Sequence, residues 1–368
     1  MWWLPFLALP VTGGTPDDAD PAVVAIVRAE TGAAQCTGTL IAERVVLTAA
    51  HCGVQLDPAG FAIEVTNQIG TGGRRIAILQ AVSHPSFDDT ENYDVALILL
   101  ADAAGVAPVS LLSSAPPLSL RVVGFGDTAG GALDGGRKRT GTTAVTSTSA
   151  RAIVLGPDPS LPCSGDSGGP AFAPTGEVAA VISRGDASCA TSAKAARVDA
   201  HLATFITPYL AATAPGTISL GDPCLYDAHC ASGSCLEAVD EPLVHYCSTD
   251  CAHDSDCPEA MQCDEHACRY PTPSPGAIGA SCTANTDCVR GECIDAGTCS
   301  IRCVTGRGDC PADFACEHMG GIDFFCAPSP TSGGCCDAGT GSAPGALLFG
   351  LGLALYLSTG RRCSSRCR

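Results

Sequence analysis

The sequence predicts an all-β fold, a closed Greek-key β-barrel with one helix after its strands, on three observations. Short runs rich in Val and Ile recur in the first part of the chain. Turns of Gly, Pro and Asp separate these runs. Only one segment in this part has apolar residues at helical spacing. Further along, clustered cysteines predict small disulfide-rich modules, and an uncharged C-terminal run predicts a hydrophobic tail helix.

The composition is that of an acidic protein with more than one domain. At 368 residues the chain is too long for one ordinary core, so two or more domains are expected. The apolar fraction of 46% is typical of globular proteins. The formal net charge is −18. Because this charge repels phosphate backbones, no nucleic-acid partner is expected.

Cysteine usage predicts an oxidising compartment. Of the 24 cysteines, 16 fall between Cys224 and Cys326. Zinc is the competing explanation, but the paired C-x-x-C spacing of zinc sites is absent from this segment. Disulfides are therefore predicted, and neither a metal nor a cofactor is expected.

The first ten residues, MWWLPFLALP, predict a signal-like segment over residues 1–10. An ordinary buried N-terminus is the alternative. The signal is favoured, because a disulfide-rich chain must be exported.

The predicted strands form two sets. Those of the first set are short and rich in β-branched residues, and they cover residues 23–27, 36–41, 45–48, 61–65, 75–82 and 95–100. A stretch rich in small residues follows at 103–117 and predicts a crossover. Strands of the second set are predicted within residues 120–125, 140–155, 171–172 and 178–183. Residues 199–212 predict a helix, because their large apolar residues recur at three- and four-residue spacing.

One stretch carries a candidate nucleophile. Ser167 lies in the small-residue loop Gly-Asp-Ser-Gly-Gly-Pro. Gly165 gives the loop conformational freedom, so that the N–H groups of Gly165 and Ser167 can point at one oxyanion. A serine is inert until a base removes its proton, so a histidine and an orienting acid are required. His51 ends one apolar run and Asp94 begins another.

These residues lie in the motifs TAAHC, DVAL and GDSGGP, in that order. The set resembles the chymotrypsin/trypsin family of serine proteases over residues 11–212. The resemblance implies a double six-stranded barrel with a terminal helix packed on the second barrel. It implies that Ser167 attacks a peptide carbonyl, His51 removes its proton and Asp94 orients His51. It also implies the disulfides Cys36–Cys52 and Cys163–Cys189.

Three other side chains near the histidine and aspartate motifs are expected to have no role in catalysis. Asp88 and Asp89 are alternative acids, expected to be solvated in a polar turn. His84 is expected to be a surface turn residue.

The resemblance extends to activation and substrate choice. Val11, followed by Thr-Gly-Gly, matches the start of a mature chain whose α-amino group pairs with Asp166. We therefore expect cleavage before Val11 to produce the active form. In the specificity pocket, Leu161 is expected at the floor, and the wall strand is Ser183-Arg184-Gly185. An apolar floor disfavours substrates with Arg or Lys at the cleaved bond, and Arg184 replaces an aromatic residue.

Cysteine-rich segments follow the protease-like part. Residues 213–222 predict a linker, 223–270 a first module, 271–280 a second linker and 281–328 a second module. Each module has eight cysteines, for which 105 pairings are possible. Two functions are open, a stalk and a ligand-binding module, with the stalk slightly favoured. Acidic residues in the first module suggest weak calcium binding, although their spacing fits no loop motif (Asp254, Asp256, Asp264 and Glu265).

The tail, residues 329–368, combines Cys335 and Cys336, a hydrophobic segment over 343–360 and a basic end. The uncharged run reaches the length a bilayer needs. The arrangement resembles the MYXO-CTERM class of C-terminal sorting tails. That resemblance implies processing or lipidation at Cys335 or Cys336 and a membrane association through the tail.

Together these patterns predict a secreted serine endopeptidase, associated with the cell surface or outer membrane, that acts on proteins or peptides. The alternative is a catalytically inactive, protease-like adhesion protein. The oligomeric state stays open.

Overall fold

The computed structural model describes residues 10–88, 93–289, 291–294, 297–303, 310–311, 314–318 and 324–328. The chain divides into two compact units, Met1–Ile301 and Arg302–Arg368. Nearly all of the predicted signal-like segment lies outside the described residues, and so does the tail with Cys335, Cys336 and the hydrophobic segment 343–360. No helix among the described residues is long and apolar enough to cross a membrane.

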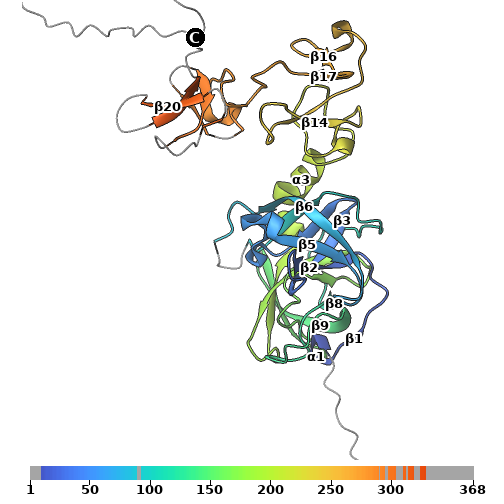
Figure 1. The fold of residues 1–368 in the computed structure, drawn as a ribbon. Helices are drawn as coiled ribbons and strands as arrows, with labels where there is room; N and C mark the ends of the chain where they lie inside the picture. The colour runs from blue at the N-terminus through green and yellow to red at the C-terminus, as the bar shows by residue number, and fades with distance from the viewer. Residues whose placement is uncertain are drawn as a thin grey trace, which may run out of the picture. The chain divides into compact units, whose positions relative to one another are not determined.

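Six antiparallel strands close the first barrel, drawn in blue shades in Figure 1. They are β2 (Val23–Arg28), β3 (Ala34–Ala42), β4 (Val45–Thr48), β5 (Phe61–Val65), β6 (Arg74–Ser83) and β7 (Ala96–Leu100), joined in the order β2-β3-β4-β7-β6-β5. All of β4 and β7 is buried, which explains their unbroken apolar runs. Three single turns connect β4 to β5, namely η1 (Ala50–Cys52), η2 (Val54–Leu56) and η3 (Pro58–Gly60). The six predicted strands of this half are confirmed.

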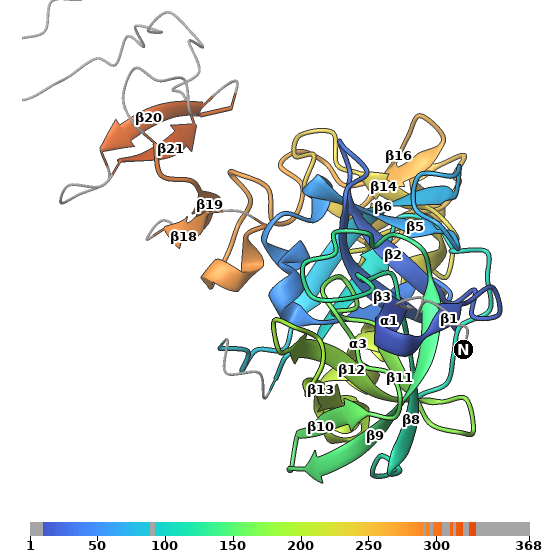
Figure 2. The same cartoon turned by 90° about the horizontal axis from the view of Figure 1, so that it is seen from below.

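The second barrel contains one strand that the sequence did not indicate. Its strands are β8 (Ser119–Gly124), β9 (Arg139–Thr148), β10 (Ala152–Pro157), β11 (Pro170–Phe172), β12 (Val178–Gly185) and β13 (Ala193–Arg197). The sheet runs β9-β10-β13-β12-β11-β8, and pairing of β8 with β9 closes it. Figure 2 shows these strands together. The unpredicted strand is β13, which pairs with β10 and β12.

The N-terminal segment lies along the second barrel. It consists of the turn α1 (Pro10–Gly13), whose backbone is not helical at Val11 and Thr12, and the short strand β1 (Thr15–Pro16). β1 pairs with β9, and Thr12 bridges to Leu161. Val11 is buried in the core of the second barrel.

The predicted helix after β13 exists but is irregular. It comprises α2 (Val198–His201), a wider turn η4 (Leu202–Ile206) and α3 (Thr207–Ala212). Pro208 has no N–H to donate, and the wide turn lies just before it. Ile206 belongs to a core cluster with residues of both barrels, and Tyr209 Oη donates to Gln80 Oε1 of β6 at 3.2 Å. The start of the helix packs on β12 of the second barrel, as the family resemblance implied, while its end reaches the first barrel.

The cysteine-rich part consists of four small units, each with four cysteines joined first to third and second to fourth. The disulfides are Cys224–Cys235 and Cys230–Cys247, Cys251–Cys263 and Cys257–Cys268, Cys282–Cys293 and Cys288–Cys299, and Cys303–Cys316 and Cys310–Cys326. Each unit has one two-stranded sheet: β14 (Cys235–Glu237) with β15 (His245–Cys247), β16 (Gln262–Asp264) with β17 (Ala267–Arg269), β18 (Glu292–Ile294) with β19 (Thr298–Ser300), and β20 (Phe314–His318) with β21 (Phe324–Pro328). The repeat is thus half as long as the eight-cysteine repeat expected.

An Asp or Asn side chain at the same position organises each of the first three cysteine-rich units. Each contains a single turn after its first cysteine, namely η5 (Asp227–His229), η6 (Asp254–Asp256) and η7 (Asn285–Asp287). The first residue of each turn accepts a hydrogen bond from the N–H of the unit's third cysteine, at 3.0, 2.9 and 2.9 Å. Asp256 accepts two further bonds, from the N–H groups of Ala252 and His253. Asp254 and Asp256, weighed above as calcium ligands, therefore bond to the backbone of their own unit.

Residues 213–222, predicted as a linker, are hydrogen-bonded to the first cysteine-rich unit. The N–H groups of Gly216 and Ile218 donate to that unit's backbone, and so does the N–H of Gly221. Tyr226 lies buried against the first barrel, with the Arg44 guanidinium 4.6 Å from its ring centre. Tyr226 Oη donates to Thr213 O at 2.6 Å. The first cysteine-rich unit is therefore docked on the first barrel.

Candidate active site

His51 is held in place by the strand before it and by a disulfide. It lies in η1, directly after the buried strand β4 and between buried Ala50 and Cys52. The predicted disulfide Cys36–Cys52 ties this turn to β3. The imidazole itself is 26% exposed. The backbone is thus fixed while one side of the ring stays open to a substrate.

Asp94 lies just before β7 and is completely buried. Its Oδ1 accepts from the His51 N–H at 2.9 Å, and its Oδ2 lies 2.7 Å from His51 Nδ1. The Ser183 hydroxyl also donates to Oδ2. Burial alone would raise the pKa of Asp94, but the bonds from His51 and Ser183, with the His51 charge, bring that pKa below its usual value. Asp94 is therefore an ionised acceptor that fixes the ring of His51.

Ser183 connects the acid to the nucleophile. Its hydroxyl bonds to Asp94, and its carbonyl oxygen accepts from Ser167 Oγ at 3.0 Å. The structure therefore gathers His51, Asp94 and Ser167 around one residue of β12. No hydrogen bond joins Ser167 to His51 within the described structure. The sequence indicates Ser183 only as part of the pocket wall, and no local pattern marks its bond to Asp94.

The loop before Ser167 directs two N–H groups away from the protein. The Ser164 carbonyl accepts from the Asp127 N–H at 2.7 Å, and the Asp166 carbonyl accepts from the Gly169 N–H at 2.9 Å. In a trans peptide the N–H points opposite to the carbonyl, so the N–H groups of Gly165 and Ser167 face away from these partners. Among the described residues neither N–H has an acceptor. Gly165 reaches this conformation at a φ of 94°, which favours glycine.

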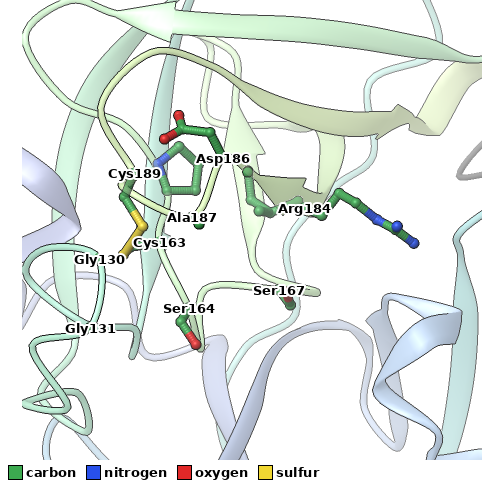
Figure 3. A pocket seen from close by; sticks show the side chains of 12 residues that line it. Gly130, Gly131, Cys163, Ser164, Ser167, Arg184, Asp186, Ala187 and Cys189 are labelled. Atoms are coloured by element: carbon green, nitrogen blue, oxygen red, sulfur yellow. A yellow bond between two sulfur atoms is a disulfide. The ribbon is translucent and has the colours of Figure 1, made fainter.

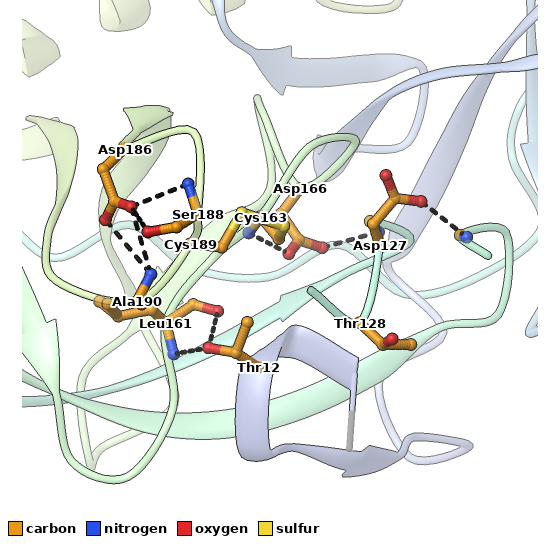
Figure 4. Close-up of a disulfide and its surroundings, with 12 residues drawn as sticks. Thr12, Asp127, Thr128, Leu161, Cys163, Asp166, Asp186, Ser188, Cys189 and Ala190 are labelled. Carbon is orange, nitrogen blue, oxygen red and sulfur yellow. Dashed lines mark hydrogen bonds between the residues drawn. A yellow bond between two sulfur atoms is a disulfide. The ribbon is translucent and has the colours of Figure 1, made fainter. Parts of the chain in front are cut away.

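The predicted activation pair lies in the second barrel. The Thr12 hydroxyl donates to Leu161 O at 3.3 Å and accepts from the Leu161 N–H at 3.2 Å (Figure 4). With the bond from the Thr12 N–H to Leu161 O at 3.0 Å, these contacts anchor the segment that carries buried Val11. The Asp166 carboxylate accepts from the N–H groups of Gly126 and Cys163, each at 2.8 Å. No cation contacts it among the described residues. Burial, with a smaller effect of nearby Asp127, raises the pKa of Asp166 to about 7.

This raised pKa predicts a pH-dependent stability of the chain in which the peptide bond before Val11 is intact. Between pH 4 and 7 the unfolded chain has lost the Asp166 proton while the folded chain keeps it, so the free energy of unfolding falls as pH rises. The shift from 3.8 to about 7 corresponds to a loss on the order of 4 kcal/mol. Denaturant unfolding of the protease domain at several pH values measures it. Asp166→Asn should flatten this slope, and an unchanged slope would contradict the assignment.

The specificity cavity differs from the prediction at its floor. A cavity of about 220 Å³ lies beside Ser167, between the predicted disulfide Cys163–Cys189 and Arg184 (Figure 3). Its remaining lining is Gly130, Gly131, Pro162, Ser164, Ile182, Gly185, Asp186 and Ala187. Leu161 is not part of this lining, because its side chain is fully buried in the core of the second barrel.

One carboxylate, that of Asp186, borders the cavity, and it is occupied by its own loop. It accepts hydrogen bonds from Ser188, Ala190, Thr191 and Ser192. These bonds, led by that of the Ser188 hydroxyl, hold the pKa of Asp186 well below its usual range. In Figure 3 its oxygens point away from Ser167. The described cavity therefore offers no free acid to a basic substrate side chain.

His84, expected on the surface, is buried, with its ring 4.7 Å from that of Tyr93 and 5.0 Å from that of Phe205.

The described clusters that have metal-ligand spacing consist of disulfide-bonded cysteines, in one case with His51. Sulfur atoms in a disulfide are not the thiolates that bind metal ions.

Comparison with known proteins finds similarity to trypsins and to another serine protease. A family model described as Trypsin matches residues 11–206. Trypsin 5G1 of Aedes aegypti is 32% identical over 25% of this chain and 38% of that protein. Serine protease SP24D of Anopheles gambiae is 31% identical over 41% of this chain and 62% of that protein. For a trypsin of Saccharopolyspora erythraea the identity is 28%, over 41% of this chain and 75% of that protein.

The first two of these relatives are thus matched over less than two thirds of their own length. Among solved structures, neuropsin, a serine protease expressed in the limbic system of mouse brain, has 20% identity and a TM-score of 0.48. That match covers 54% of this chain and 98% of the neuropsin chain.

Proposed function

Because this chain belongs to the trypsin family of serine proteases, matched over residues 11–206, we propose that it is an endopeptidase whose catalytic residues are His51, Asp94 and Ser167. The observation that carries the proposal is the contact between buried Asp94 and His51 Nδ1, at 2.7 Å. This contact fixes the proton of neutral His51 on Nδ1. It leaves Nε2 free to accept the proton of a serine.

The steps of the reaction follow from this arrangement. The Ser167 hydroxyl turns from the Ser183 carbonyl toward His51, gives its proton to Nε2, and its oxygen bonds to the substrate carbonyl carbon. The carbonyl oxygen becomes an oxyanion and accepts from the N–H groups of Gly165 and Ser167. As the C–N bond breaks, His51 gives its proton to the leaving amine. Water then hydrolyses the acyl-enzyme by the same route.

Labelling by a fluorophosphonate tests this proposal. The reagent phosphonylates a serine only where a base activates it, so the chain beginning at Val11 is expected to be labelled and Ser167→Ala is not. The bond of Ser167 to Ser183 favours one alternative, an inactive protease-like binding protein. Absence of labelling in that active-form chain, with its fold intact by circular dichroism, would support this alternative.

The cavity supports a preference for small or medium apolar residues at the cleaved bond. A substrate Arg or Lys would enter a site where Asp186 is already bonded to its own loop. We expect such peptides to be cleaved at least about tenfold more slowly than Ala or Val peptides. A peptide library measures the preference, and faster turnover of the basic peptides would contradict it.

Different observations support an extracellular location and attachment to the cell surface. The ten disulfides among the described residues fit an extracellular protein. Attachment to the cell surface rests on the sequence of the tail, where Cys335 or Cys336 would be the processing site. Mass spectrometry of the mature C-terminus tests this, and a chain that still ends at Arg368 would contradict processing.

A further inference from the structure

Thr37 of β3 is fully buried, and each of its polar groups is hydrogen-bonded. Its N–H donates to Ser167 O at 2.8 Å, and its carbonyl accepts from Thr48 Oγ1 at 2.9 Å. Its hydroxyl donates to Gly165 O at 2.8 Å and accepts from the Phe125 N–H at 3.1 Å. One residue of the first barrel thus contacts both residues whose N–H groups face the proposed oxyanion.

These bonds act on a residue of the loop whose backbone has few steric restraints. Gly165 has no Cβ and sits at a φ of 94°, so its own sterics leave both adjoining peptides free to turn. The peptide before Gly165 is held by the bond from Asp127 to the Ser164 carbonyl. The peptide after Gly165 is held by the Thr37 hydroxyl. The first bond orients the Gly165 N–H directly, because that N–H lies in the same peptide as the Ser164 carbonyl. The second bond, with that from the Asp166 N–H to Cys163 O at 3.0 Å, fixes the peptide after Gly165 and so the position of the Gly165 Cα.

We propose that Thr37 is a positioning residue of the oxyanion site, because its hydroxyl fixes the Gly165 peptide. The inference rests on the proposed function. Without the hydroxyl, the peptide between Gly165 and Asp166 loses one of its two bonds and keeps that from the Asp166 N–H to Cys163 O at 3.0 Å. The Gly165 Cα can then shift, and the Gly165 N–H, which belongs to the preceding peptide, no longer converges with that of Ser167. The bond from the Thr37 N–H to Ser167 O persists in any substitution except proline, so a side-chain change removes only the hydroxyl's bonds to Gly165 and Phe125.

The chain supplies a matched control two residues further along the same strand. Thr39 is also buried, but its hydroxyl has no hydrogen-bond partner in the described structure. Thr37→Val and Thr39→Val therefore make the same chemical change in the same strand. Only the first removes hydrogen bonds to Gly165 and Phe125.

The test compares these variants in the chain beginning at Val11. Thr37→Val is expected to lower kcat by about 10- to 100-fold, with KM within about threefold, since oxyanion contacts act mainly in the transition state. Affinity for a peptide aldehyde, whose adduct places an oxyanion in the site, should fall by the same factor as kcat/KM. Thr37→Ser should restore kcat to within about threefold of wild type, and Thr39→Val should leave both quantities unchanged.

Each result is decisive. If the wild-type chain is active and Thr37→Val matches it in kcat and aldehyde affinity, the positioning role is wrong while the protease function stands. A Thr37→Ser variant as impaired as Thr37→Val would also overturn it. If the wild type neither cleaves peptides nor reacts with fluorophosphonate, the proposed function itself fails. Should Thr37→Val not fold, Thr37→Ala admits water to the freed Phe125 N–H, and the same loss of kcat and aldehyde affinity is expected.

Discussion

Replacing Asp94 by asparagine is expected to lower kcat by about 10⁴-fold, the cost of this change in Ser-His-Asp triads. Asp94 accepts from His51 Nδ1 at 2.7 Å. An asparagine amide can donate to that nitrogen instead, which moves the ring proton to Nε2. His51 then cannot accept the proton of Ser167, and the negative charge that would stabilise the protonated ring is gone. Hydrolysis of a peptide amide by the chain beginning at Val11 measures the loss.

Asp88 offers the control for this substitution. It is an exposed aspartate that precedes Asp94 in the sequence. Asp88→Asn changes the charge equally and is expected to leave kcat within about twofold, as surface substitutions usually do. Circular dichroism should show the same fold in both variants. If Asp94→Asn keeps wild-type kcat, another residue orients His51 and the assignment is wrong.

Cleavage before Val11 is expected to raise activity by about two orders of magnitude or more. In the uncleaved chain the buried carboxylate of Asp166 has two N–H donors and no cation among the described residues. A buried charge without its partner costs about 3–5 kcal/mol, and each 1.4 kcal/mol is a factor of ten. A free α-amine at Val11 would supply the partner and hold the loop of Ser167 in its active form. Activity before and after cleavage, with N-terminal sequencing, measures the gain.

The position and charge of the amine are both testable. A chain beginning at Pro10 carries an amine one residue too far away and should remain at the low activity of the uncleaved chain. Asp166→Asn should abolish the gain in the chain beginning at Val11. Activity of that chain should also fall at alkaline pH, as the amine loses its proton above a pKa raised from about 8 by the carboxylate. Full activity of the Pro10 chain would rule out the ion pair.

Both barrels could be predicted largely from local patterns. Buried strands such as β4 and β7 are unbroken apolar runs, and each triad residue occurs in a short motif next to such a strand. In contrast, β13 reads Ala-Lys-Ala-Ala-Arg, which has no β preference of its own. Pairing with β10 and β12 on both sides makes it a strand.

The environment of the site could be read only in part. Leu161 was expected at the floor of the pocket, but its side chain is buried in the core of the second barrel and does not line the cavity. His84 looked like a turn residue because Pro follows it, yet Tyr93 and, from the distant helix, Phe205 cover it. Such contacts join residues far apart in the sequence, so no local pattern records them.

The sequence by itself indicated a candidate nucleophile, base and acid, and it determined the all-β class and the disulfide-rich part, because each depends on residue types at short, fixed spacing. Only the tertiary structure decided how they are held. It joined the cysteines first to third and second to fourth, placed Ser183 between Asp94 and Ser167, and set the Thr37 hydroxyl against Gly165. These bonds depend on where the chain returns after many residues, which closure of the two barrels decides.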